Sequence, residues 1–222
     1  MKIKLSIIFL TIVVVFTASC SKIDTIGHYS VRSFNEILTN APQLVTPDEA
    51  NNGWSLAAPD SSARFIWSSN FDMMVEFDAI PFIAAGLDPA SLPSHFSFDG
   101  EQNLLITGAK LRTEQLRYKG EATPLASYEQ IVRHRPLAVG YHSAGGHYGV
   151  ELGNGNMFEW AGDLAANNND IVFVLDPEPF IAAGTDTDSI EGWALTKVSV
   201  HGGGGGTNMV QVDKLLKRFD LP

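Results

Sequence analysis

Hydrophobic and polar residues alternate along several short runs of this chain, which is the pattern of half-buried β-strands. The first clear run begins at Phe71, where apolar side chains at every second position alternate with mostly acidic ones as far as Asp78. A second run, IVFVL at 171–175, is apolar throughout, so we expect a central strand with both faces buried. Two alternating runs flank Asn-Gly in GVELGNGNMFEW, 149–160, which predicts a β-hairpin.

The first two runs belong to an internal repeat. Residues 72–92 and 170–190 align without a gap, and 10 of the 21 positions are identical. The shared centre is the hexapeptide PFIAAG, at 81–86 and again at 179–184. Such self-similarity is typical of a duplicated structural unit.

Each copy of the repeat changes from the strand period to a short helical pattern. Asp78 and Asp176 stand where a helix N-cap is expected, and proline suits the first turn of a helix. Gly86 and Gly184 follow the two alanines, where a helix ends at a left-handed residue. Each copy is therefore predicted to form a strand, a short helix and a glycine stop. The apolar residues of the hexapeptide are expected in the core, namely Phe82, Ile83, Phe180 and Ile181.

These patterns predict a β-rich α+β fold with two tandem copies of a small strand–short helix–strand unit and mostly antiparallel strands. The C-terminal tail VDKLLKRFDL spaces Val212, Leu215, Leu216 and Phe219 at helical intervals. This spacing predicts a short amphipathic helix docked on the core. The expected organisation is a signal peptide at 1–19, a lipid-anchored tether at 20–39, repeat unit 1 at 40–110, a linker at 111–124 and repeat unit 2 at 125–222.

The N-terminus has the pattern of a secretory signal. Lys2 and Lys4 precede an apolar run at 5–16 that is too short to span a bilayer comfortably. Small residues follow, and the segment ends at Cys20, the only cysteine of the chain. This segment resembles the lipobox of bacterial lipoproteins. The resemblance implies that Cys20 becomes the lipid-modified, palmitate-bearing N-terminus of a membrane-anchored protein of the bacterial cell envelope, periplasmic or surface-exposed.

Composition narrows the range of partners. The formal net charge is −10, which makes the chain a poor candidate for binding nucleic acid or anionic lipid headgroups. Membrane contact is therefore expected through the lipid on Cys20. A single cysteine excludes disulfides within the chain, so stability must come from a packed core. A protein or small-molecule partner is expected, and no motif requires a cofactor.

The richest polar stretch lies between His134 and Asp163. Within it, HYGVELGNGNMFEW at 147–160 resembles the histidine hairpin of the NlpC/P60 and LRAT-type papain-like hydrolases. That resemblance implies that His147 is the histidine that activates a cysteine nucleophile. Since the only cysteine is Cys20, which is expected to carry lipid, the resemblance implies a relative of these hydrolases that lacks catalysis.

The same stretch offers a candidate site for a ligand or a divalent metal ion. His142 and His147 flank the Gly-Ser-rich segment YHSAGGHY, which could bend to bring the two imidazoles together. Glu151 falls on the same side of a strand as His147, because four residues preserve the face.

Three hypotheses follow from the sequence. The first is an envelope lipoprotein that binds a ligand or partner without catalysis, so that no catalytic residue is expected. The second is an inactive papain-like hydrolase relative. The third is a divalent-metal-binding module at His142, His147 and Glu151.

Overall fold

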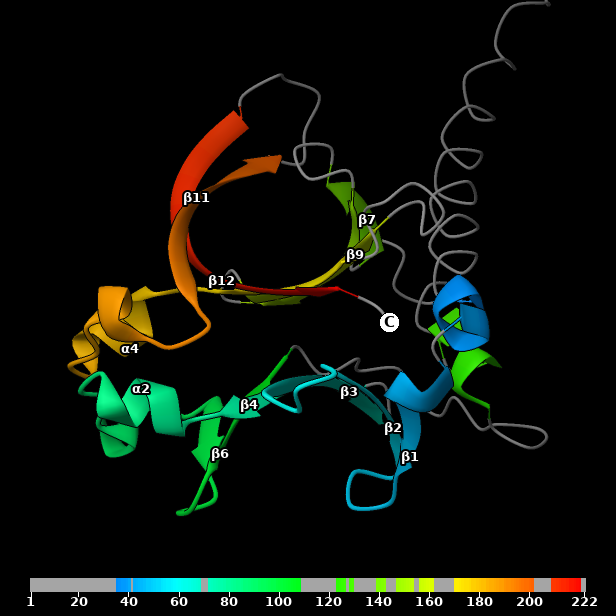
Figure 1. Ribbon diagram of the computed structural model, residues 1–222, viewed down its shortest axis with the longest axis horizontal. Helices are drawn as coiled ribbons and strands as arrows, with labels where there is room; N and C mark the ends of the chain where they lie inside the picture. The colour runs from blue at the N-terminus through cyan, green and yellow to red at the C-terminus, as the bar shows by residue number, and fades with distance from the viewer. Residues whose placement is uncertain are drawn as a thin grey trace, which may run out of the picture.

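The computed structural model describes residues 35–40, 42–68, 72–108, 123–126, 128–129, 139–142, 147–153, 156–161, 170–201 and 209–220. These residues build two six-stranded antiparallel sheets with a few short helices (Figure 1). The β-rich α+β class and the antiparallel pairing expected from the sequence are confirmed. The signal segment, Cys20 and most of the linker lie outside the described residues.

The first sheet comes from the N-terminal half and has the order β1-β2-β3-β4-β6-β5, with every neighbouring pair antiparallel. A short 3-10 helix, η1, precedes it at Pro42–Leu44. The strands are β1 (Val45–Asp48), β2 (Gly53–Ala57), β3 (Ala63–Ser68), β4 (Met73–Asp78), β5 (Phe96–Phe98) and β6 (Asn103–Thr107).

The second sheet has the order β7-β8-β9-β10-β12-β11, which matches the first sheet strand for strand when both are read along the chain. As expected, β10 lies inside the sheet with both faces buried. The hairpin of β8 and β9 also forms as predicted. The strands are β7 (Val139–His142), β8 (His147–Gly153), β9 (Asn156–Ala161), β10 (Asp170–Leu175), β11 (Ala194–His201) and β12 (Met209–Asp220).

A short helix follows the equivalent strand in each half. In the first half these elements are α2 (Ile80–Ala84) and the 3-10 helix η2 (Pro89–Ser91), and in the second half α4 (Glu178–Ala182) and η4 (Thr187–Ser189). Gly86 and Gly184 end the two α-helices with φ of +100° and +92°. The Gly86 N–H donates to Ile83 O at 3.0 Å and the Leu87 N–H to Phe82 O at 2.9 Å, which is the Schellman ending. The predicted glycine stops are confirmed.

Asp78 and Asp176 lie one residue before the helix N-caps and not at the N-caps, where they are predicted. The N-cap residues are Ala79 and Pro177. The Asp78 carboxylate accepts the N–H of Ile80 at 2.9 Å, and the Asp176 carboxylate accepts that of Glu178 at 3.2 Å. Each carboxylate therefore closes an Asx turn that leads into the helix, instead of standing at the cap itself.

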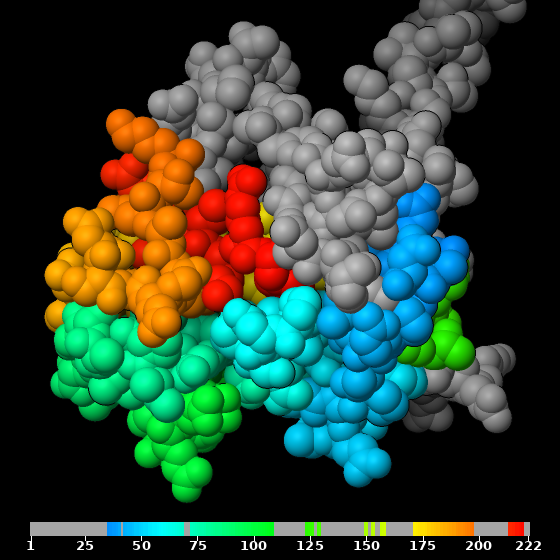
Figure 2. All heavy atoms as spheres, viewed as in Figure 1, coloured from blue at the N-terminus to red at the C-terminus, as the bar shows by residue number. Residues whose placement is uncertain are grey.

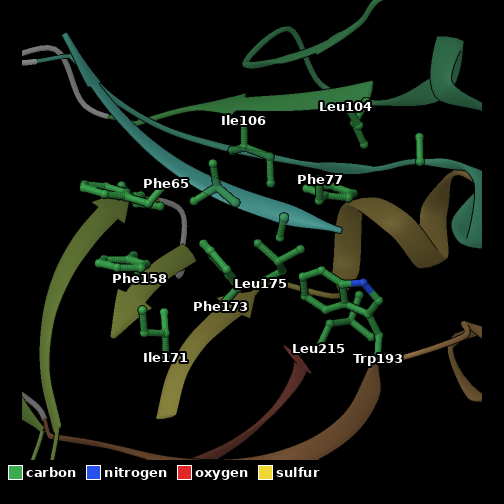
Figure 3. Packing of buried hydrophobic residues seen from close by; sticks show 14 of the residues in the cluster. Phe65, Phe77, Leu104, Ile106, Phe158, Ile171, Phe173, Leu175, Trp193 and Leu215 are labelled. Atoms are coloured by element: carbon green, nitrogen blue, oxygen red, sulfur yellow. The ribbon is translucent and has the colours of Figure 1, made fainter. Parts of the chain in front are cut away.

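The main core lies between the two sheets, and we call the face that each sheet turns toward the other its inner face. Phe65 of β3 and Phe158 of β9 stack across the core with ring centroids 4.4 Å apart. Figure 3 shows Phe77 and Leu104 from the first sheet facing the side chains of the second. Because Phe82 and Phe180 join the same cluster, the core also fixes both helices.

The two PFIAAG helices meet at one end of the sandwich (Figures 1 and 2). The Asp88 N–H donates to Ala183 O at 2.8 Å, and the Asp186 N–H donates to Ala85 O at 2.7 Å. These four residues occupy equivalent places in the two copies, so the contact is reciprocal, as in a two-fold interface.

Two predictions about burial are only half right. Phe82 and Phe180 are fully buried, but Ile83 and Ile181 are 39% and 46% exposed. A helix of five residues turns only one face toward the core, so the residue next to the buried phenylalanine points away from it.

The predicted C-terminal amphipathic helix is wrong, because residues 209–220 form the long strand β12. This strand pairs with both β10 and β11. Leu215 and Phe219 of this strand both pack on the main core. Two lysines of this strand have little exposure to solvent. Lys214 is buried, and the Lys217 ammonium lies 3.3 Å from an Asp60 carboxylate oxygen. Tertiary pairing has overridden the local helical spacing.

The packed part of the chain begins before residue 40. Residues 35–40 are helical, and Ile37, which lies in the expected tether, is fully buried in the main core. Within the described residues, no helix is long and apolar enough to cross a membrane.

Candidate functional site

A pocket of about 290 Å³ opens on the outer face of the first sheet, the face turned away from the core. It lies where β1 to β4 and β6 come together near the start of β3. Its lining combines hydroxyl, carboxylate, amide and guanidinium groups. The lining residues are Thr46, Ser55, Ala57, Ser61, Ala63, Arg64, Glu76, Phe77, Asp78 and Asn103.

Strand register brings the polar side chains of the pocket together. Arg64 of β3 lies opposite Glu76 of β4, and Thr46 of β1 lies opposite Ser55 of β2. The hydroxyl oxygens of the last pair are 3.2 Å apart, within hydrogen-bond reach. Because side chains alternate between the faces of a strand, the neighbours of Arg64 along β3 point into the core while Arg64 itself points outward.

Arg64 is the central charge of this site. Its Nε donates to Glu76 Oε1 at 2.7 Å and a terminal nitrogen donates to Oε2 at 3.2 Å, a bidentate pair. This hydrogen bond is the main reason why the pKa of Arg64 is raised above its usual value, against the opposing effect of burial. The Arg64 side chain remains 35% exposed, so the guanidinium is both fixed and accessible.

A second carboxylate approaches the guanidinium from β1. Asp48 Oδ2 lies 3.5 Å from an Arg64 terminal nitrogen, and the Asp48 side chain is only 4% exposed. The Asn51 backbone N–H and side-chain amide also donate to Asp48, at 3.1 Å. These donors and the nearby guanidinium compensate for the burial of the charge.

Asp78 and Asn103 form one end of the pocket and are cross-strand partners. The Asn103 amide donates to Asp99 Oδ2 at 2.8 Å, which fixes that side chain. Asp99 also accepts three backbone N–H groups, and the hydrogen bond from Glu101 is the largest of the causes that lower the pKa of Asp99 to about 2. The loop that positions Asn103 is therefore organised around a carboxylate that stays ionised.

The pocket suits binding better than proton transfer. Both oxygens of Glu76 are occupied by Arg64, so this carboxylate orients the guanidinium. The hydroxyls of Thr46, Ser55 and Ser61 can both donate and accept. With Arg64 neutralised by Glu76 and with Asp78 and Asp48 close by, the pocket disfavours anionic ligands.

The equivalent place on the second sheet has the opposite character. There Met157 of β9 lies opposite Val174 of β10, at the positions that Arg64 and Glu76 occupy in the matching strands of the first sheet. Met157, Val172 and Val174 are buried in a small apolar cluster of their own, with Leu216 packed against it. The two halves therefore share strand order but differ in the chemistry of their outer faces.

The histidines singled out from the sequence stand on neighbouring strands of the second sheet. His142 of β7 is the cross-strand partner of His147 of β8. Glu151 is four residues further along β8, opposite Met157, so its Cα is about 13 Å from that of His147. The side chains of these three residues lie outside the described part of the structure.

The register places another acidic position closer to the histidines than Glu151. Glu159 of β9 lies opposite Gly149 of β8, which in turn lies opposite Gly140 of β7. Position 159 is thus diagonal to His147 on the same face of the sheet, about 7–8 Å away. The side chain of Glu159 also lies outside the described part. Among the described residues, no group of three or more histidine, cysteine, aspartate or glutamate side chains is placed to hold a metal ion.

Sequence reasoning did not identify the Arg64 pocket. In the sequence, Glu76 stands only on the polar side of an alternating strand, and no motif includes Arg64. The available signal was an arginine inside an otherwise apolar strand, RFIW at 64–67, followed by a glutamate in the next strand. Pairing the two positions requires the β3–β4 register, which the single sequence does not give.

Comparison of the chain with protein-family models, with curated proteins and with solved structures finds no match. A function for this chain therefore has to be argued from its own residues and their geometry.

Proposed function

We propose that this chain is a lipid-anchored protein of the bacterial envelope that binds a small, uncharged, hydroxyl-rich ligand in the Arg64 pocket without catalysis. The observation that carries this proposal is the Arg64 guanidinium, held by both oxygens of Glu76 and still partly exposed to the pocket. The guanidinium N–H groups that Glu76 leaves unused are held in a fixed position beside hydroxyls and a carboxylate, so they are preorganised to hydrogen-bond to neighbouring hydroxyls of a ligand.

Size and charge narrow the class of ligand. A volume of about 290 Å³ is at the lower limit of small-molecule sites, which fits a molecule the size of a monosaccharide. Asp78 and Asp48 leave the surroundings of the pocket net negative, which disfavours phosphates and carboxylates. Acceptors and donors are both present, as an uncharged polyol requires.

A backbone NMR titration with monosaccharides tests this proposal. We expect glucose, galactose, mannose or N-acetylglucosamine to shift amide resonances around β1 to β4, with weak affinity, while citrate shifts none of them. Ala57→Phe places a large side chain in the pocket opposite Arg64, so it should abolish the shifts. Ala194→Phe, the same substitution at an exposed position of β11, serves as the matched control and should bind as the wild type does.

Three results would remove the pocket proposal. These are a preference for citrate over every sugar, resonance shifts confined to the second sheet, and equal binding by the Ala57→Phe and Ala194→Phe variants. Each of them would place recognition outside the Arg64 pocket or would reverse its charge preference.

The anchor is proposed from the N-terminal segment alone. The Lys-apolar-small-Cys pattern that ends at Cys20 supports lipid modification there. Metabolic labelling with a palmitate analogue should mark the wild type and leave Cys20→Ser unmarked. Equal labelling of the two proteins would contradict the anchor while leaving the pocket proposal intact.

We also propose that the two halves are tandem copies of one unit, residues 40–110 and 125–222. Three observations support this: the identities in the repeat, the matching strand orders and the reciprocal bonds of Asp88 and Asp186. An experimental structure in which β4–α2–η2 fails to superpose on β10–α4–η4 would contradict it.

A divalent-metal site is the second candidate function. The observation that favours it is the register of His142 opposite His147, since directly opposed positions have Cβ atoms about 5 Å apart. Glu151 and Glu159 are the acidic positions on the same face. Metal that binds only the folded protein raises the melting temperature, so zinc, copper, nickel or iron(II) should stabilise the wild type and not His147→Ala. Equal shifts in both proteins would end this hypothesis.

A further inference from the structure

The end of the sandwich that carries α2 and α4 exposes an apolar surface. Ile80, Ile83 and Ile181 are 51%, 39% and 46% exposed, which makes them three of the four exposed large hydrophobic residues in the described chain. Ala84 and Ala182 beside them are also exposed. We call these five residues the helical-end patch. The bonds of Asp88 and Asp186 hold the two helices together, so both halves of the chain contribute to this surface.

The sequence around the patch contains acidic residues and no lysine or arginine. Neither 65–109 nor 136–196 contains a basic residue of either kind, although they carry 6 and 9 acidic residues respectively. Five of these acidic residues are exposed on or near the helices, namely Asp88, Glu178, Asp186, Asp188 and Glu191. Lys217, which lies next to Gly192, is already bonded to Asp60 and has a side chain only 12% exposed. The apolar patch therefore has a negative border without a compensating free cation among these residues.

Part of this negative border is rigid before anything binds. Asp88 accepts from the Ala90 N–H at 3.1 Å and from the Ser91 hydroxyl at 3.0 Å. Asp186 makes the equivalent bonds to the Asp188 N–H and the Ser189 hydroxyl, at 3.2 and 2.7 Å. Fixed charges of this kind lose little side-chain entropy when a partner docks.

The α2 and α4 sides of the patch differ in charge, so a bound partner would have one preferred orientation. Ile80 in the first copy corresponds to Glu178 in the second, and Ala90 corresponds to Asp188. The α2 half is therefore apolar where the α4 half is acidic. A partner that matches both halves must present apolar side chains at one end and basic side chains at the other.

We propose that the helical-end patch docks a cationic amphipathic segment of a partner protein, with apolar side chains on Ile80 and Ile83 and lysine or arginine beside Glu178 and Asp188. Complementary charge favours this occupant and speeds its encounter. An anionic bilayer would be repelled by the acidic border. A second copy of this chain would bring equal negative borders together, which disfavours self-association through this surface. The proposal is independent of the Arg64 pocket, because the two surfaces share no residue.

The probe is a labelled helical peptide with leucine on one face and lysine on the other, compared with a peptide in which every lysine is glutamate. Fluorescence anisotropy with the full chain should show saturable binding of the lysine peptide at low salt. That binding should weaken in high salt. The glutamate peptide should not bind.

Matched variants locate the binding. Glu178→Lys should weaken the lysine peptide about tenfold, whereas Glu49→Lys makes the same charge change at an exposed turn outside the patch and should leave affinity within about twofold of the wild type. Replacing Ile83 and Ile181 together by serine should also weaken binding about tenfold through lost apolar contact. A melting curve for each variant shows that it is folded.

Several results would overturn the proposal. They are equal binding of the two peptides, no binding of either, and equal loss in Glu49→Lys and Glu178→Lys. Concentration-dependent dimerisation that Ile83→Ser abolishes would assign the patch to a second copy. The patch would be assigned to a membrane if the protein bound vesicles of phosphatidylglycerol better than vesicles of phosphatidylcholine and Ile83→Ser abolished that preference.

Discussion

A Cβ atom at Gly86 would lie 2.6 Å from the carbonyl oxygen of Gly184, and one at Gly184 would lie 3.0 Å from the carbonyl oxygen of Gly86. The two glycines therefore do more than end their own helices. Each keeps clear the space that the backbone of the other copy occupies. A Cβ atom at Gly86 would therefore be unfavourable for two reasons. It would strain a backbone with positive φ, and it would clash with the backbone of the other half at the junction.

Gly86→Ala is expected to lower the free energy of unfolding by more than its backbone strain alone. A non-glycine residue at φ +100° costs about 1–3 kcal/mol, and the contact with Gly184 O adds to this because a carbonyl oxygen of the backbone cannot move aside freely. Urea denaturation of the two proteins measures the difference.

Gly100→Ala is the matched control for this prediction. Gly100 has φ of +90°, but a Cβ there meets nothing within 4 Å, so the control reports the backbone strain without the junction. Equal destabilisation by Gly86→Ala and Gly100→Ala would show that the close approach of the two copies has no energetic weight.

The stacked pair of Phe65 and Phe158 is expected to couple the two sheets. Their rings are 4.4 Å apart and inclined by 7°. A double-mutant cycle with Phe65→Leu and Phe158→Leu should give a coupling energy of about 0.5–1.5 kcal/mol in urea denaturation. Phe65 and Phe180 form the control pair, since the ring of Phe180 packs on Phe77, Phe82 and Phe96 instead. A coupling as large in that pair would contradict a direct effect of stacking.

The repeat and its local chemistry could be predicted because they depend on neighbouring residues. A glycine after two alanines predicted the left-handed ends at Gly86 and Gly184, and the all-apolar run 171–175 predicted an internal strand. The C-terminal tail could not be assigned in the same way. Leu215, Leu216 and Phe219 fit both periods, and only pairing with β10 and β11 selects the strand.

Thr185→Val is expected to stabilise the protein. The Thr185 hydroxyl is buried and has no hydrogen-bond partner among the described residues, while Leu87 occupies the equivalent place in the first copy. Removing an unsatisfied buried hydroxyl should raise the free energy of unfolding by about 1 kcal/mol. Thr187→Val, at a half-buried position of η4, makes the same change as a control. A gain from the control and none at Thr185 would contradict this account.

Asp99 is expected to make stability depend on pH in the acid range. Its pKa is lowered to about 2 from 3.8, so in the folded protein the ionised form is favoured. The stabilisation is therefore complete above pH 3.8 and is lost as the pH falls through about 2. The ¹³C carboxyl resonance of Asp99 should titrate near this lowered pKa in the folded protein. In urea it should titrate near the ordinary value. Equal midpoints in the two states would contradict the prediction.

The candidate site was less accessible to sequence reasoning than the fold. Arg64 and Glu76 are twelve residues apart, and nothing local indicates that they face each other. The sequence points to His142 and His147 because histidines and glycines cluster there, whereas a single arginine in a strand gives no such signal. Spacing along a strand predicts Glu151 as their acidic neighbour. The register of β8 and β9 instead makes Glu159 the nearer acidic position.

The reciprocal junction of Ala85 with Asp186 and Ala183 with Asp88 has a consequence for how the two halves can change. Separate identical units would have to find each other in solution, and every substitution would appear twice in the pair. A continuous chain holds the second half at a high effective concentration next to the first. The junction between the halves therefore forms independently of the protein concentration. Under the duplication proposed above, each half is free to diverge wherever the junction is untouched. The ion pair of Arg64 with Glu76 on one sheet and the pairing of Met157 with Val174 on the other show this difference: the two halves pack as equals and present different surfaces.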